Sequence, residues 1–215
     1  MGLRQVFASL ILGLPLAGFG HDAVALGDRV AWTRVPTVTV ISMEPDDRVQ
    51  LVREAVDYWN QCLLEMGTPF RLGAVRRTDG VVAVDDLSLL SSSGPVVFPE
   101  SVHRTPGDIV VALSDGDIVS FSARWPGHQK ALVGIKNQRL YPLTLPNVTR
   151  NVIAHELGHA IGLARHNDDP SKLMCGRPAR CRPDIYASET QRFFPLTDDE
   201  KAFLLRLYPR DWKPR

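Results

Sequence analysis

Apolar and polar positions first alternate near residue 37, in a run of β-branched residues where threonine alternates with valine. This alternation predicts a strand over Thr37–Ser42. A helical period follows, opening at Asp46 or Asp47 and running to about Met66, where Gly67 is placed to end it.

Three further short apolar runs predict strands, at Phe70–Val75, Asp108–Leu113 and Ala131–Lys136. A second helix is expected to begin near Asn147 or Thr149, either of which could cap it. Its apolar positions fall at helical spacing: Val152, Ile153, Leu157, Ala160, Ile161 and Leu163. A last helix follows Thr197, which forms a capping-box pattern with Glu200 and is followed by acidic residues that suit the positive helix end.

Composition is compatible with one globular domain. The chain has 215 residues, 44% of them hydrophobic, and a formal net charge of +1. A nucleic-acid partner would require Lys and Arg to cluster on one face, and the sequence has no dense basic patch. Residues 71–77, with Arg71, Arg76 and Arg77, are interpreted as a solvated loop.

The amino terminus has the pattern of a cleavable export signal. Arg4 precedes an apolar stretch from Val6 to Phe19, and Ala23-Val24-Ala25 supplies small residues for cleavage after Ala25. The apolar stretch is interrupted by Gly and Pro and is shorter than the ~20 residues of a membrane span. We therefore expect residues 1–25 to be removed and residues 26–215 to form the mature domain, secreted or periplasmic, without a stable membrane anchor.

The chemistry is concentrated in His155-Glu156-Leu157-Gly158-His159. Two histidines four apart project from one helix face, so both can reach one metal ion. Glu156 lies about 100° around the helix from His155, beside the metal, where a general base would stand. Gly162 can take a positive φ and end the helix, which would turn the chain back to deliver His166 as a third ligand.

These residues resemble the metzincin clan of zinc metallopeptidases, and most closely its matrix-metalloproteinase-like, single-domain members, whose signature is H-E-x-x-H-x-x-G-x-x-H followed by a turn bearing methionine. The signature would place the third histidine at 165, where this chain has Arg165, which cannot ligate zinc. Met174 follows His166 by eight positions, as in such chains, which favours a one-residue insertion before His166.

The resemblance implies a fold and roles for several residues. The fold would be α+β, with a twisted mixed five-stranded sheet packed on two long helices and a smaller irregular C-terminal subdomain ending in a helix. Ala131–Lys136 would be the edge strand that pairs with substrate backbone. Met174 would form a hydrophobic floor beneath the ligands. A tyrosine two residues after the methionine, which assists in some members, is replaced by Gly176.

Cysteine usage fits export. Cys175 and Cys181 are six apart, and in an oxidising compartment this spacing predicts a local disulfide that braces the loop after Met174. Cys62 is expected to be a buried packing residue.

Several alternatives stay open. Asp168 or Asp169 could replace His166 as third ligand, and Glu189 could serve in a different type of zinc site. Asp115-Gly116-Asp117 could bind calcium, although a plain turn is favoured because nothing nearby completes the ligand set. Residues Ser91–Pro95 are expected to form an exposed loop, and His103 and His128 to lie on the surface.

The sequence therefore predicts an exported, monomeric zinc endopeptidase that acts on a peptide or protein substrate, in which Glu156 activates a water molecule polarised by one zinc ion. The alternative is a catalytically silent, zinc-stabilised binding protein with the same fold. Substrate preference is not legible from the sequence.

Overall fold

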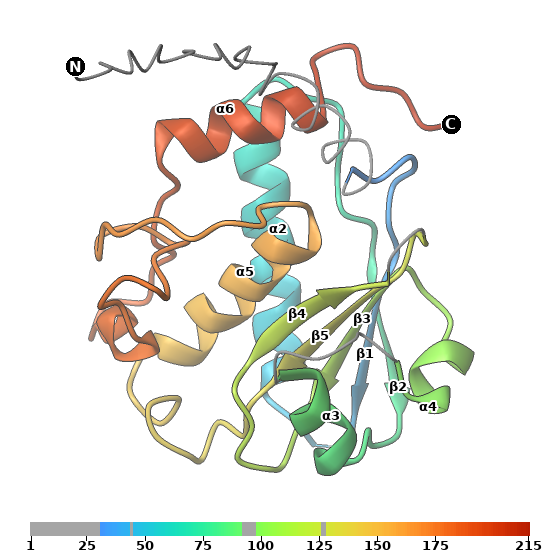
Figure 1. The fold of residues 1–215 in the computed structure, drawn as a ribbon, viewed down its shortest axis with the longest axis vertical. Helices are drawn as coiled ribbons and strands as arrows, with labels where there is room; N and C mark the ends of the chain where they lie inside the picture. Colours follow the sequence, from blue (N-terminus) through green and yellow to red (C-terminus); the bar gives the residue numbers. More distant parts are fainter. Residues whose placement is uncertain (1–30, 44, 92–97, 126–127) are drawn as a thin grey trace, which may run out of the picture.

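The computed structural model describes residues 31–215 except 44, 92–97 and 126–127, so the expected signal segment and most of the Ser91–Pro95 loop lie outside it. A five-stranded sheet carries helices on both faces, and an irregular C-terminal part ends in a helix (Figure 1). In chain order the elements are β1 Val38–Ser42, α2 Arg48–Glu65, β2 Val75–Asp79, α3 Val84–Ser91, α4 Glu100–Arg104, β3 Ile109–Leu113, β4 Phe121–Arg124, β5 Ala131–Ile135, α5 Val148–Ala160, the 3₁₀ turn η1 Pro183–Tyr186 and α6 Asp198–Leu207.

The sheet is mixed, with strand order β2-β1-β3-β5-β4. The first four strands in this order run parallel, and β4 pairs antiparallel with β5. β1, β3 and β5 are buried throughout, and the sequences of β3 and β5 are accordingly continuous apolar runs, whereas β1 includes Thr39 and Ser42. The expected α+β class with a mixed five-stranded sheet is confirmed.

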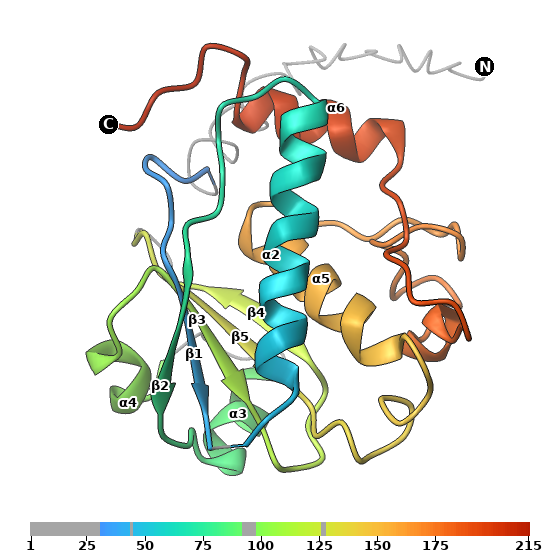
Figure 2. The same ribbon diagram turned by 180° about the vertical axis from the view of Figure 1, so that it is seen from behind.

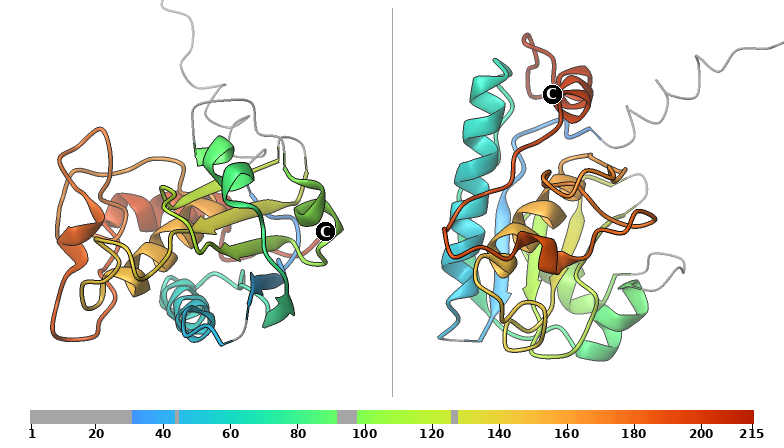
Figure 3. Two further views of the ribbon diagram at one scale, coloured as in Figure 1. Left: turned by 90° about the horizontal axis from the view of Figure 1, so that it is seen from below. Right: turned by 90° about the vertical axis from the view of Figure 1, so that its left-hand side faces the viewer.

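Helices cover both faces of the sheet, as the view from behind and the view from below show (Figures 2 and 3), and an apolar layer lies on each face. The larger layer joins the sheet to α2, α5 and α6, and includes Trp59, Leu157 and Tyr208. The smaller one lies under α3 and α4 and includes Leu87 and Val102. α5 packs on the sheet, on α2 and on η1, so it is held on three sides.

Two strand predictions were wrong. β5 is an interior strand, whereas the edge next to it is β4, which the sequence analysis missed. β4 is half-buried and reads Phe-Ser-Ala-Arg, so it lacks the apolar run that reveals an interior strand. β5 has a neighbouring strand on each side, β3 and β4. Its apolar sequence therefore reflects burial inside the sheet and not a position at the edge.

The strand predicted at Phe70–Val75 begins only at Val75 and continues through Arg76 and Arg77 to Asp79, which also corrects the solvated loop expected at 71–77. An apolar residue stands at position 70 because Phe70 is buried and stacks on Tyr208, with ring centroids 3.7 Å apart. The Asn60 side chain binds both the N–H and the C=O of Leu72, which keeps this segment irregular.

The helix ends differ in how they are capped. α6 has the predicted capping box between Thr197 and Glu200. α2 is followed by Gly67 at φ 78°, as expected. Asn147 stands at the N-cap of α5 with φ 68°, but its side chain does not cap the helix. It binds the backbone of Tyr186 and Arg192 instead, tying the start of α5 to the C-terminal part.

Candidate metal centre

Three imidazoles meet beside the C-terminal half of α5. His155 and His159 come from successive turns of this helix, and His166 comes from the chain that leaves it. Their Nε2 atoms lie 3.1 Å (His155 to His159), 3.1 Å (His155 to His166) and 2.9 Å (His159 to His166) apart. Within the described part of the chain, this is the group of three or more His, Cys, Asp or Glu side chains that could hold a metal ion.

The other nitrogen of each ring shows why the three Nε2 atoms converge. His155 Nδ1 donates to the Leu173 carbonyl at 2.7 Å, His159 Nδ1 to the Leu163 carbonyl, and His166 Nδ1 to the Arg177 carbonyl at 2.8 Å. A carbonyl only accepts, so each Nδ1 carries a proton, and in the neutral form of each ring the lone pair is then on Nε2. Three Nε2 lone pairs therefore point at one another.

Converging lone pairs repel unless a cation lies between them. Four-coordinate zinc with bonds of 2.0–2.1 Å would separate its nitrogen ligands by about 3.3 Å, close to the spacings found here. Backbone carbonyls that hold Nδ1–H are the usual means of orienting histidine ligands. The residues present thus fit a zinc ion.

Burial keeps the two helical histidines neutral. Loss of solvent lowers the pKa of His155 to about 3, with the nearby His159 and His166 adding to the effect, and lowers that of His159 to about 4. Ligand histidines must be unprotonated, so both are ready to bind a metal at neutral pH.

Glu156 lies one residue further along α5 and borders the same cavity as His155. It is 8% exposed, and burial raises the pKa of its carboxyl to about 8. A buried acid with a raised pKa next to a metal site has the properties of a general acid–base group.

Met174 is fully buried and packs against α5 at Gly158. A Cβ at Gly158, within the ligand-bearing turn of α5, would stand 2.7 Å from the Met174 sulfur and 2.8 Å from the Trp59 ring. Gly158 is therefore needed for this close packing. Trp59 also donates to the Ala154 carbonyl at 2.8 Å, which locks α5 onto α2.

The extra residue before His166 is accommodated in the turn that ends α5. Gly162 adopts φ 121°, and the Leu163 N–H bonds back to the Gly158 carbonyl at 3.0 Å. The next segment is fixed by Asn167, whose N–H donates to the Met174 carbonyl at 2.9 Å and whose carbonyl accepts from Gly176 at 3.3 Å. His166 consequently reaches the cluster although it stands one position late.

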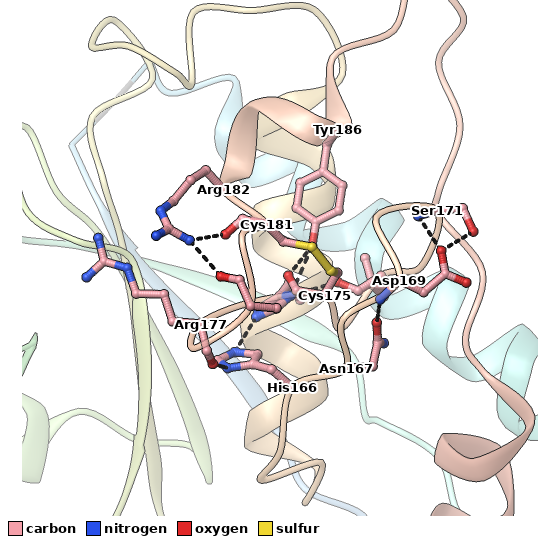
Figure 4. The surroundings of a disulfide bond; sticks show 12 residues. His166, Asn167, Asp169, Ser171, Cys175, Arg177, Cys181, Arg182 and Tyr186 are labelled. Carbon is pink, nitrogen blue, oxygen red and sulfur yellow. Dashed lines mark hydrogen bonds between the residues drawn. A yellow bond between two sulfur atoms is a disulfide. The ribbon is translucent and has the colours of Figure 1, made fainter.

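A disulfide joins Cys175 to Cys181, as predicted, and closes the loop beside His166 (Figure 4). Two groups of this loop contact the third imidazole. The Arg177 carbonyl accepts from Nδ1, and Gly176 lies flat against the ring. Cys62 was expected to be buried but is only half-buried.

Tyr186 is a residue that the sequence analysis missed. It lies on η1, its hydroxyl donates to the Leu173 carbonyl, and this hydroxyl is 3.1 Å from His155 Nδ1. Burial raises the pKa of the phenol above its ordinary value, so it remains a donor. No sequence motif identifies Tyr186, because its contact with His155 depends on how the C-terminal part folds back on α5.

The alternative ligands lie elsewhere. Asp169 accepts from the N–H and hydroxyl of Ser171, and neither it, Asp168 nor Glu189 joins the cluster. Asp115 and Asp117 flank a bend and form ion pairs with Arg48 and Lys136, at 3.6 Å and 2.6 Å. His103 and His128 pack on Trp125.

No protein-family model matches the chain, and no curated protein matches it. Solved structures with a similar course of the chain include archaemetzincin from Methanopyrus kandleri, with 18% identity over 81% of this chain and 96% of that one, and a TM-score of 0.48. Metalloproteinase-II from Bacteroides fragilis has 15% identity over 83% of this chain and 54% of that one, and a TM-score of 0.47. Myroilysin has 14% identity over 84% and 86%, and a TM-score of 0.37.

Similarity at these levels defines no shared activity. The structure confirms the expected fold class and brings His155, His159 and His166 together as a group that could hold a metal ion. In the described ranges, none of the helices has the length and apolar character needed to span a bilayer.

Proposed function

We propose that this protein is an exported zinc endopeptidase. The observation that carries the proposal is the convergence of three Nε2 lone pairs, each set by an Nδ1–H···O=C bond, directly beside the buried carboxyl of Glu156. Three imidazoles leave a fourth position open, which is the ligand set of catalytic sites and differs from that of closed structural ones.

When bound, a zinc ion at this cluster would supply a Lewis acid that polarises a peptide carbonyl and lowers the pKa of water to about 7. His155, His159 and His166 would hold it. Glu156 takes a proton from the attacking water and delivers it to the departing amine, so that one carboxyl serves first as base and then as acid.

A peptide can be positioned by the fold itself. β4 is the sheet edge nearest the site and pairs on one side only, with β5. An extended substrate can add to the free side through main-chain hydrogen bonds, which would orient its backbone across the metal. Main-chain pairing accepts many sequences, so side-chain selection must come from a pocket.

Export is supported by the disulfide, because such bonds persist in oxidising compartments. It is also the function expected of residues 1–25, and Ala25 is the proposed cleavage point. We take the mature protein to be a monomer that releases the two product peptides after cleavage.

The decisive variant for activity is Glu156→Gln, which keeps the shape of the side chain and removes its proton chemistry. We expect it to bind zinc as the wild type does and to cleave a denatured protein substrate at least 100-fold more slowly, since general acid–base groups typically contribute 10²–10⁴-fold. A zinc-stabilised binding protein would instead show no proteolysis in the wild type. Unchanged proteolysis in Glu156→Gln would contradict the assigned role.

Thermal unfolding of the metal-free variant serves as the control for folding. Burial raises the Glu156 pKa from 4.5 to about 8, so the native state holds a proton that the unfolded chain releases above pH 4.5. This costs stability progressively as the pH rises from 4.5 towards 8. Glutamine removes this loss of stability. At pH 8 the metal-free Glu156→Gln variant should therefore unfold at a higher temperature than the metal-free wild type, and at pH 4 the two should differ little.

A further inference from the structure

A cavity of about 220 Å³ opens next to the metal centre, with His155, Glu156 and Tyr186 on its inner side. Most of the remaining wall is apolar, including Ile118, Leu143 and Val152. A peptide held on the metal would place a side chain that flanks the cleaved bond in this cavity. The chemistry of its wall therefore bears on substrate selection.

Two basic side chains, Lys136 and Arg177, also line the cavity. Lys136 is largely buried, and its ammonium group forms an ion pair with Asp117 at 2.6 Å. Arg177 is exposed, and among the described residues no carboxylate lies within ion-pair distance of its guanidinium. Figure 4 shows this guanidinium extending away from the disulfide loop.

The backbone of Arg177 is fixed although its side chain reaches solvent. Its carbonyl accepts the His166 Nδ1–H at 2.8 Å, and its loop is closed by the Cys175–Cys181 disulfide. The backbone position from which the Arg177 side chain extends is therefore fixed relative to the His166 imidazole. A planar guanidinium is well suited to a carboxylate, which it can bind through two parallel N–H···O bonds.

We infer that Arg177 selects substrates with Asp or Glu directly beside the cleaved bond. This inference rests on the proposed peptidase function and adds its substrate class: acidic peptides, whose carboxylate pairs with Arg177 at the mouth of an apolar cavity. The ion pair would be partly exposed, so its effect should be modest and should weaken as salt is added.

The test is cleavage of an unbiased peptide library by the zinc-loaded protein, with the cut positions read by mass spectrometry. Matched peptides that differ only in Glu or Gln beside the cut then give the ratio of kcat/KM. We expect a preference for Glu of about fivefold at low salt, lost in Arg177→Gln and reversed towards Lys in Arg177→Glu. Arg180→Gln is the matched control, because it removes the same charge from the same loop and Arg180 does not line the cavity.

The outcomes separate the two claims. Cleavage that depends on Glu156 but shows no acidic preference, or one that Arg177→Gln leaves unchanged, overturns the role of Arg177 alone. A preference lost equally in Arg180→Gln also overturns it, because a general electrostatic field would then be responsible. Absence of any Glu156-dependent cleavage overturns the peptidase function and this inference with it.

Discussion

Gly176 lacks a side chain at a position where the His166 imidazole occupies the space. A Cβ there would stand 2.5 Å from Cδ2, 2.7 Å from Cγ and 2.8 Å from Nε2 of that ring. Its φ is not among the positive values found in the described residues, so an alanine would be strained by the imidazole and not by the backbone. A side chain at position 176 would therefore displace the third imidazole.

We predict that Gly176→Ala weakens zinc binding by about 10- to 100-fold, as loss of ligand orientation usually does. Competition with a chromophoric chelator measures the change. Gly67→Ala is the contrasting control: with φ 78° it should cost about 1 kcal/mol of stability and leave zinc affinity intact. Equal zinc affinity in Gly176→Ala and wild type would contradict the packing argument.

Much of the site at residue scale could be predicted from sequence because it is local. The spacing of His155 and His159 is a property of any helix, and counting back from Met174 identified His166. Tyr186 could not be found in this way, since its contact with His155 Nδ1 is made across the fold. The carbonyls of Leu163, Leu173 and Arg177 that set the ring tautomers were equally beyond sequence, because every residue has a carbonyl.

At the scale of elements, the loop from Cys175 to Cys181 positions the third ligand. Asn167 pairs with Met174 and Gly176 on one side of His166, and its side chain donates to Glu200 at 2.6 Å, which connects the loop to α6. The disulfide closes the other side, where Arg177 accepts from His166. The two helical ligands have no comparable need of the disulfide.

Removing the disulfide in a Cys175→Ala, Cys181→Ala double variant should therefore weaken zinc binding by about tenfold, mainly through faster release, while the α5 ligands stay in place. Cys62→Ala is the matched control, since Cys62 is far along the chain on α2 and forms no disulfide. Zinc release rates can be followed with a chelating dye. A double variant that releases zinc as slowly as Cys62→Ala would refute this role for the loop.

Interior elements could be predicted from sequence, and edge elements could not. β3 and β5 were located because burial on both faces demands apolar residues, and β1 was located by its alternating Val and Thr positions. β2 and β4 are half-buried edges that carry arginines, so their sequences resemble loops. The apolar positions of α2 and α5 could be recognised because both helices pack in the larger core, α2 along one face and α5 around most of its surface.

At the scale of the molecule, α5 is fixed by everything around it. The sheet, α2 and the C-terminal part all contact it. Trp59 of α2 and Tyr186 of the C-terminal part bind it, and Asn147 at its N-cap binds the backbone of the C-terminal part. Such support holds ligands at constant spacing, which a catalytic metal site requires. The whole fold can thus be understood as a frame for His155, Glu156 and His159, with one loop delivering His166.

The most direct test of this account is the metal content and zinc-edge X-ray absorption of the protein exported into an oxidising compartment from the full chain. The account predicts one zinc per chain with three nitrogen ligands and one oxygen, and two nitrogens in a His166→Ala variant. Absence of stoichiometric zinc, or only two nitrogens in the wild type, would contradict it, because the residue inserted before His166 would then have broken the site.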